Sequence, residues 1–120
     1  LEFSYKDDDL GDPLINSYMA KAIGAATQED IDTITKYAFE INDFLKEFFA
    51  GIGIELIDFK LEFGKTADGT IVLADEISPD TCRYWDIKTG EHLDKDRFRR
   101  DLGDPEGAYK EVFKRLGFGE

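Results

Sequence analysis

The chain has little cysteine, little positive charge and no long apolar run. Its 120 residues contain one cysteine, Cys82. A single cysteine excludes an internal disulfide and is typical of the reducing cytoplasm, which is where we expect the protein. Only 15 lysines and arginines stand against 27 acidic residues, so the formal net charge is −12. A field of that sign repels nucleic acid and anionic membranes, and no apolar run reaches the roughly 20 residues of a membrane span.

The remaining composition indicates a folded globular domain. Hydrophobic residues make up 42% of the chain, and ten of them are phenylalanine. A chain of this length is large enough to bury a core and corresponds to one domain. We therefore expect residues 1–120 to form a single domain.

Apolar spacing and capping signals predict the helices. A short helix is expected at about 17–23, and a long one begins after Thr27, with Asp30 three residues further on, and ends near Gly51. Its apolar stripe consists of Ile31, Ile34, Ala38, Ile41, Leu45 and Phe48. A stripe of this kind favours core packing over a partner-binding face. Further helices are expected at 95–102, capped by Asp94, and from Pro105 to about 116.

The alternation of apolar and polar residues predicts the strands. The expected strands lie at about 2–6, 53–63 and 70–76, with a turn at 66–70 and an extended piece at 83–86. The predicted class is α+β, an antiparallel hairpin or sheet with helices packed mainly on one side.

The segment 56–64, LIDFKLEFG, carries the chemistry that the pattern indicates. In a strand, Asp58, Lys60 and Glu62 would share one face. The other face would then hold Ile57, Phe59, Leu61 and Phe63. Within a hairpin Asp75 could approach Glu62, and two carboxylates beside a lysine suit Mg²⁺ and phosphate oxygens. A solvated strand with an ion pair between Lys60 and its neighbours is the alternative.

Four ordered blocks resemble one known family. LIDFKLEFG is followed by LADEISPDTCRYWD at 73–86, and blocks at 5–13 and 94–99 precede and follow them. In order and spacing these blocks are similar to SAICAR synthetase, the phosphoribosylaminoimidazole-succinocarboxamide synthase of purine biosynthesis. The resemblance covers nearly all of the chain and implies the C-terminal part of a two-lobe, kinase-like fold.

The resemblance implies an ATP-dependent ligase. Such an enzyme joins the carboxylate of carboxyaminoimidazole ribotide to the amine of L-aspartate and releases ADP and phosphate, through an acyl phosphate. The cofactors are then ATP and Mg²⁺, with Glu62 and Asp75 as metal ligands and Lys60 on phosphate or a substrate carboxylate. Asp58 would orient Lys60 or accept a proton from the attacking amine.

The resemblance also implies a substrate pocket. Arg83 would contact the ribotide phosphate; an ordinary ion pair with Asp80 or Asp86 is the alternative. The other residues expected to bind substrate are Ser78, Asp80, Lys95 and Arg99. Asp12 would either help to place L-aspartate or simply form the Gly-Asp-Pro turn. His92 is expected at the surface, Trp85 in packing, and Cys82 is not expected to be a nucleophile.

The family's N-terminal half, which carries the phosphate lid and the adenine pocket, is not in this sequence. We therefore expect a C-terminal portion of a longer enzyme that is inactive alone and associates with that half and into homo-oligomers. A non-catalytic acidic interaction module that keeps the fold, or an unrelated kinase-like phosphotransferase, is the alternative. The retained row of Asp58, Lys60, Glu62 and Asp75 argues against the first, and the order of the four blocks argues against the second.

Overall fold

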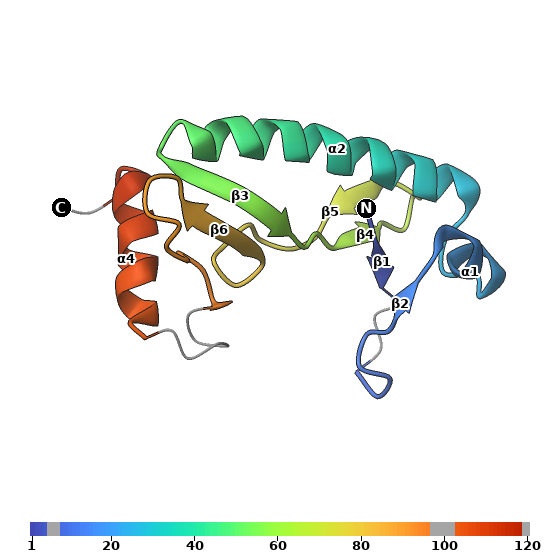
Figure 1. Cartoon of the computed structure of the whole chain (residues 1–120). Coiled ribbons are helices and arrows are strands. Elements are labelled where there is room, and N and C mark those ends of the chain that lie inside the picture. Colours follow the sequence, from blue (N-terminus) through green and yellow to red (C-terminus); the bar gives the residue numbers. More distant parts are fainter. Residues whose placement is uncertain (5–7, 97–102, 119–120) are drawn as a thin grey trace.

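The fold combines short strands with two main helices. The computed structural model describes residues 1–4, 8–96 and 103–118 (Figure 1). The elements run in the order β1 (Phe3–Ser4), β2 (Leu14–Ile15), α1 (Ser17–Ala22), α2 (Gln28–Ala50), β3 (Ile54–Phe59), β4 (Phe63–Lys65), β5 (Ile71–Leu73), β6 (Cys82–Asp86) and α4 (Pro105–Arg115). No helix among these residues is long and apolar enough to cross a membrane.

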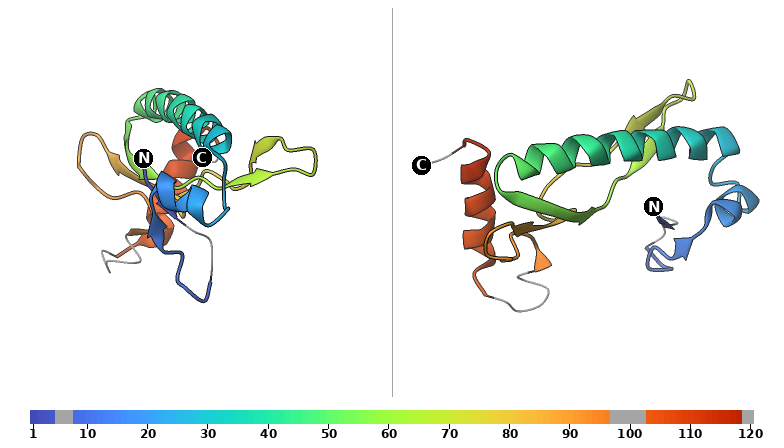
Figure 2. Two further views of the ribbon diagram at one scale, coloured as in Figure 1. Left: turned by 90° about the vertical axis from the view of Figure 1, so that its right-hand side faces the viewer. Right: turned by 45° about the horizontal axis from the view of Figure 1, so that its top comes forward.

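The strands pair as separate two-stranded antiparallel ladders. β1 pairs with β2, β3 with β6, and β4 with β5. α2 runs along the ladders and α4 lies across the end of β3 and β6, as Figures 1 and 2 show from three sides. The α+β class is confirmed, with several small ladders in place of one sheet. β1 lies within the strand predicted at 2–6, whereas its partner β2 was not predicted, because two residues give no alternating pattern.

The start of α2 is fixed by a reciprocal cap. The Thr27 hydroxyl accepts the Asp30 backbone N–H at 3.1 Å, and the Asp30 carboxylate accepts the Thr27 N–H at 3.1 Å. Lys65 of β4 lies 3.1 Å from the same carboxylate. These hydrogen bonds and the lysine hold the pKa of Asp30 below its usual value. The predicted beginning of the helix is confirmed, and it is tied to the β4–β5 ladder.

The buried face of α2 differs from the predicted stripe at its last position. Phe48 is 44% exposed, whereas Phe49 is 5% exposed. Successive helical residues are separated by about 100°, so position 49 falls in line with Ile31 and position 48 lies about 100° away. The assignment of Phe48 to the core was therefore wrong, and Phe49 takes its place.

The core lies between α2, the β3–β6 ladder and α4. Ile54 of β3 and Tyr84 of β6 are fully buried, and the Tyr84 ring lies 5.0 Å from that of Phe49. Ala108 and Val112 of α4 close the cluster from the end of the ladder. Burying side chains of this size stabilises a fold by about 1.5–3 kcal/mol each. The core thus holds β6 in place, and β6 supports the charged residues described below.

The predicted strand 53–63 does not form as one strand. β3 ends at Phe59 after an irregularity between Leu56 and Asp58, and β4 begins only at Phe63. The two parts pair with different partners, so the strict alternation of faces is lost. Ile57, predicted on the apolar face, lies at the irregularity within β3 and is 39% exposed.

Candidate active site

Residues 58–62 pass from one ladder to the other. The Lys60 N–H donates to the Thr81 carbonyl at 2.7 Å, which continues the β3–β6 pairing. Two residues later the Glu62 carbonyl accepts the Ala74 N–H at 2.8 Å, which begins the β4–β5 pairing. The charged row therefore lies at the junction of the two ladders, with Lys60 and Glu62 in the segment between β3 and β4.

The junction pairs a lysine with one carboxylate and carries a second acid on the adjoining segment of backbone. Lys60 Nζ lies 3.1 Å from Glu62 Oε1. Asp75 follows Ala74, the backbone partner of Glu62, and its Oδ1 accepts the Glu76 N–H at 2.8 Å. This set fits Mg²⁺, which proteins usually hold through one or two carboxylates together with substrate phosphates and water. The ion pair of Lys60 with its neighbour, one of the alternatives above, is present in the structure.

Arg83 is held between two carboxylates. It faces Asp58 across the β3–β6 ladder, and its Nη1 lies 2.9 Å from Asp58 Oδ2. Its Nε lies 3.2 Å from Asp96 Oδ2. The expected alternative partners, Asp80 and Asp86, are not the ones it takes. Asp58 in turn pairs with Arg83, whereas Lys60 pairs with Glu62.

A buried carboxylate supports this arrangement. Asp94 is fully buried, and its Oδ2 accepts the Tyr84 N–H at 2.8 Å while its Oδ1 accepts the Asp96 N–H at 2.8 Å. A buried carboxylate needs such donors to offset its desolvation. Asp94 thereby fixes Asp96 beside β6, within reach of Arg83. The predicted cap at Asp94 fits its bond to Asp96; most of the predicted helix 95–102 lies outside the described residues.

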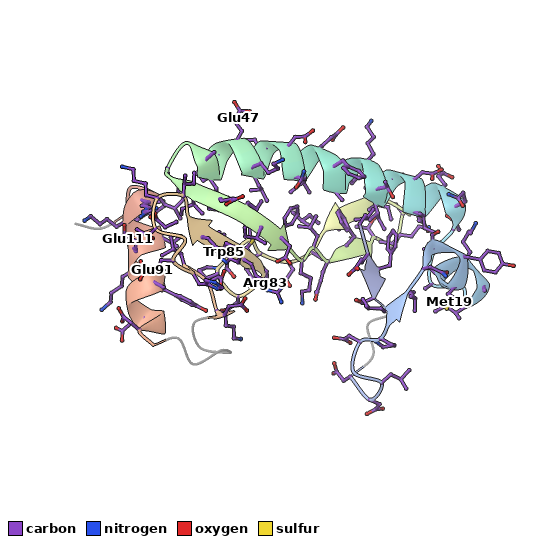
Figure 3. All side chains as sticks on the ribbon, in the orientation of Figure 1. Met19, Glu47, Arg83, Trp85, Glu91 and Glu111 are labelled. Carbon is purple, nitrogen blue, oxygen red and sulfur yellow. The ribbon has the colours of Figure 1, made fainter. Side chains whose placement is uncertain are left out.

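The loop 78–81 is ordered by its own side chains. Asp80 N–H donates to the Ser78 hydroxyl at 3.2 Å, and the Thr81 hydroxyl accepts the Ser78 N–H at 3.1 Å. The Lys95 N–H donates to the Pro79 carbonyl at 3.0 Å. These bonds bring one region together from Ser78, Asp80 and Lys95. Arg83, labelled on β6 in Figure 3, lies beside it.

Cys82, beneath this region, is a core residue. It is 2% exposed, and burial raises the pKa of its thiol, with the charges of Asp58 and Asp94 adding to the effect. A thiol with a raised pKa is a poor nucleophile. Burial likewise raises the pKa of the neighbouring Tyr84 hydroxyl. The low exposure of Cys82 and the raised pKa of its thiol agree with the expectation that it is not a nucleophile.

His92 and Trp85 pack against each other. Their rings stack at 4.7 Å, and the two residues form an isolated antiparallel bridge. His92 is half-buried, so its expected place at the surface was wrong. It also lies near Asp94 and Asp96, with one ligand atom from each within 4.8 Å of the others. Those two carboxylates already bind backbone N–H groups and Arg83.

Asp12, a predicted substrate residue, lies apart from this site. Asp12 lies in the loop before β2, which Figures 1 and 2 place away from β6. Its φ of +50° is a conformation suited to a turn residue. Arg99 lies outside the described residues.

Two residues that matter to the geometry were not predicted. Asp96 contacts Arg83, and Tyr109 of α4 donates from its hydroxyl to Asp80 at 2.7 Å. The Asp-Lys-Asp run at 94–96 was a usable signal for Asp96, since its flanking acids resemble those of the 58–62 row. Nothing in the helical sequence around Tyr109 indicates its contact, because that contact joins residues 29 positions apart.

Comparison with known proteins identifies the family. The family model for SAICAR synthetase matches residues 1–116. The phosphoribosylaminoimidazole-succinocarboxamide synthase of Lachnoclostridium phytofermentans is 72% identical over 117 residues, which are 98% of this chain and 49% of that protein. The enzyme of that name from Clostridium botulinum strain Eklund 17B is 73% identical over 115 residues, 96% of this chain and 49% of its own length. The chain thus spans about half the length of these relatives.

Solved structures agree with the sequence comparison. A SAICAR synthetase in complex with ADP superposes with a TM-score of 0.91 at 55% identity, over 96% of this chain and 49% of that one. The Ehrlichia chaffeensis phosphoribosylaminoimidazole-succinocarboxamide synthase gives a TM-score of 0.93 at 43% identity, over 99% and 52%. Family model, sequence identity and fold coincide, and the chain belongs to the SAICAR synthetase family.

Proposed function

We propose that this chain supplies part of the active site of an ATP-dependent ligase that joins carboxyaminoimidazole ribotide to L-aspartate. The observation that carries the proposal is the junction of the two ladders, where Lys60 pairs with Glu62, Asp75 follows the backbone partner of Glu62, and Asp58 pairs with Arg83. The set of Lys60, Glu62 and Asp75 suits a polyphosphate with its metal ion, and Arg83 suits an anionic acceptor. A phosphoryl-transfer ligase requires both. The family membership supports this assignment.

The nucleotide side is assigned to three residues. Glu62 and Asp75 would hold Mg²⁺, and Lys60 would contact a phosphate or the substrate carboxylate. When bound, Mg²⁺ neutralises phosphate charge and polarises the transferred group. The solved relative in complex with ADP supports a nucleotide on this fold.

The acceptor side is assigned to Arg83, Lys95, Ser78 and Asp80. A guanidinium suits bidentate contact with a phosphate, and Arg83 pairs through Nη1 with Asp58 and through Nε with Asp96. Arg99 would add a third cation to the ribotide site. Asp12 is proposed to help place L-aspartate once the remainder of the enzyme is present.

The reaction would proceed through an acyl phosphate. The ribotide carboxylate is too poor an electrophile for direct attack by an amine, so its oxygen first takes the terminal phosphoryl group of ATP and ADP is released. The amine of L-aspartate then attacks the acyl carbon, the C–O bond to phosphate breaks, and the amine loses a proton. Asp58, on β3 at the start of the junction, is the proposed acceptor of that proton.

The proposal includes the half of the relatives that this chain does not span. We propose that the missing half lies N-terminal and supplies the adenine pocket, that this portion alone is inactive, and that the complete enzyme is a cytoplasmic homo-oligomer. Exposed aromatic residues of α2, Phe39 and Phe44, provide apolar surface for such contacts. The buried, unpaired Cys82 suits a reducing compartment.

A chimera tests the proposal directly. This chain would replace the matching 117 residues of the L. phytofermentans relative, and ADP release would be measured with Mg-ATP, the ribotide and L-aspartate. We expect ADP only when all three substrates are present, and none from this chain alone. A folded chimera that releases no ADP, beside an active parent enzyme, would contradict the proposal and favour the non-catalytic interaction module.

A further inference from the structure

The hydroxyl of Tyr109 joins the last helix to the loop that carries Asp80. Its Oη donates to Asp80 Oδ1 at 2.7 Å. The Tyr109 ring packs against the core beside Ala108 and Val112, whereas Asp80 is exposed. A well-anchored ring therefore holds an exposed carboxylate, and an exposed side chain without such a contact would sample several rotamers.

The loop does not depend on Tyr109 for its backbone shape. Thr81 and Cys82 N–H groups both donate to the Ser78 carbonyl, at 3.1 and 3.0 Å. The Thr81 hydroxyl donates to the Glu76 carbonyl at 3.0 Å. These bonds fix the turn from within, so the Tyr109 hydroxyl acts on the direction of the Asp80 side chain itself.

Asp80 has a chemical role that its cationic neighbours cannot perform. Arg83 follows it by three residues, and the Lys95 backbone is bonded to Pro79. Those cations suit the anionic parts of a substrate. A carboxylate only accepts hydrogen bonds, so Asp80 would take a donor, which on these substrates is a ribose hydroxyl or the amino group of the ribotide, or the amine of L-aspartate.

We propose that Tyr109 is a positioning residue for this enzyme: its hydroxyl sets the Asp80 carboxylate to accept a hydrogen bond from a substrate donor. The proposal rests on the proposed function, since it needs a substrate beside Asp80. It adds a residue of α4 to the determinants of substrate affinity. No chemical step is assigned to Tyr109.

The competing explanation is that the bond merely attaches α4 to the loop. The same helix has a second attachment, because Arg115 pairs with Asp86 at the other end of β6 and donates from Nη1 to the Gly53 carbonyl at 3.2 Å. Weakening that attachment loosens α4 without touching Asp80. It therefore separates attachment from positioning.

The experiment uses the chimera with the L. phytofermentans relative and compares Tyr109→Phe with Arg115→Gln. Tyr109→Phe keeps the ring and removes one hydroxyl; Tyr18→Phe removes a hydroxyl from a residue that is 76% exposed. We expect Tyr109→Phe to raise one KM by about threefold to tenfold, as the loss of one hydrogen bond implies, with kcat and the KM for ATP nearly unchanged. A rise in the KM for the ribotide assigns the donor to the ribotide, through a hydroxyl or its amino group, and a rise in the KM for L-aspartate assigns it to the amine of L-aspartate.

Further variants decide the outcome. Asp80→Asn should raise the same KM, and Tyr109→Phe added to it should raise that KM no further. Arg115→Gln should lower the melting temperature and leave every KM unchanged, and Tyr18→Phe should change neither. Unchanged KM values in Tyr109→Phe, or a rise of equal size in Arg115→Gln, would overturn the positioning role while leaving the ligase assignment intact. An unsubstituted chimera without activity would instead remove the proposed function, and the positioning role with it.

Discussion

Arg83 and Asp58 face each other across the β3–β6 ladder, with Nη1 of the arginine 2.9 Å from Oδ2 of the aspartate. The pair joins the two parts of the candidate site, the charged row 58–62 and the loop 78–81. Asp58 begins the charged row, and Arg83 follows the loop by two residues. Both side chains are about half exposed, so the pair contributes little to stability. We therefore expect substitutions of this pair to affect substrate binding more than the stability of the fold.

Removing Arg83 should weaken ribotide binding. In the chimera, Arg83→Ala is expected to raise the KM for the ribotide by at least about tenfold, because a charge-assisted bond to phosphate contributes about 1.5–3 kcal/mol. Steady-state ADP release over a range of ribotide concentrations measures it. An unchanged KM would rule out the phosphate contact. Lys88→Ala, which removes an exposed cation from the turn after β6, should leave the KM unaltered.

Replacing Glu62 should reduce turnover far more than stability. Glu62→Gln keeps the size of the side chain and removes one proposed metal ligand, so kcat should fall by about a hundredfold or more and the required Mg²⁺ concentration should rise. The ion pair with Lys60, whose own side chain is 63% exposed, contributes less than about 1 kcal/mol to the free energy of unfolding.

The matched control for Glu62 lies on the neighbouring strand. Glu55 is exposed on β3 and pairs in register with Trp85. Glu55→Gln removes the same charge from the same sheet region and should leave kcat and the Mg²⁺ requirement unchanged. Equal activity of Glu62→Gln and Glu55→Gln would exclude Glu62 from the metal site.

The helix starts were predictable from the sequence, because they are fixed by contacts between residues that lie close together in the chain. Thr27 and Asp30 form their cap within four residues, and the helices beginning at Gln28 and Pro105 were placed correctly for that reason. Pro105 follows Asp104, whose carboxylate accepts the Gly107 N–H at 3.1 Å. Such interactions are encoded in short stretches of sequence and survive in the folded protein.

Long-range pairing was beyond those signals. Periodicity suggested one strand through 53–63, but the chain changes partner between Lys60 and Glu62, and only the positions of Thr81 and Ala74 show where. The partners of Arg83 were missed for the same reason, since Asp58 and Asp96 reach it through tertiary structure. Sequence identified the charged residues, and the fold decides which of them meet.

The Asp86–Arg115 pair should make stability depend on acid pH. The Arg115 side chain, helped by backbone N–H groups of Thr89 and Lys88, lowers the pKa of Asp86 to about 2 from 3.8. Because the folded pKa is the lower one, the stabilisation is complete above about pH 4 and is lost as the pH falls toward 2. Asp86→Asn should therefore lower the melting temperature at pH 6 and have a smaller effect at pH 3. Asp43→Asn, on the exposed side of α2, should have little effect at either pH.

The cap of α2 should contribute measurably to stability. Thr27→Ala removes the acceptor of the Asp30 N–H and is expected to lower the free energy of unfolding by about 1 kcal/mol, measured by urea denaturation of the chain. Thr27→Ser keeps the hydroxyl and should retain most of the stability. If alanine and serine were equally stable there, the cap would not contribute to the fold.

Cys82 should report on the opening of the core. Because it is 2% exposed and burial raises the pKa of its thiol, both access and thiolate fraction are low in the folded chain. A thiol reagent such as dithionitrobenzoate should therefore react much more slowly in buffer than in about 6 M urea, where the core is exposed. Val112→Ala enlarges the space beside Cys82 within the same core cluster and should speed labelling in buffer, because it lowers the free energy of opening. Rapid labelling of the unsubstituted chain in buffer would contradict the buried position and would reopen the question of a reactive Cys82.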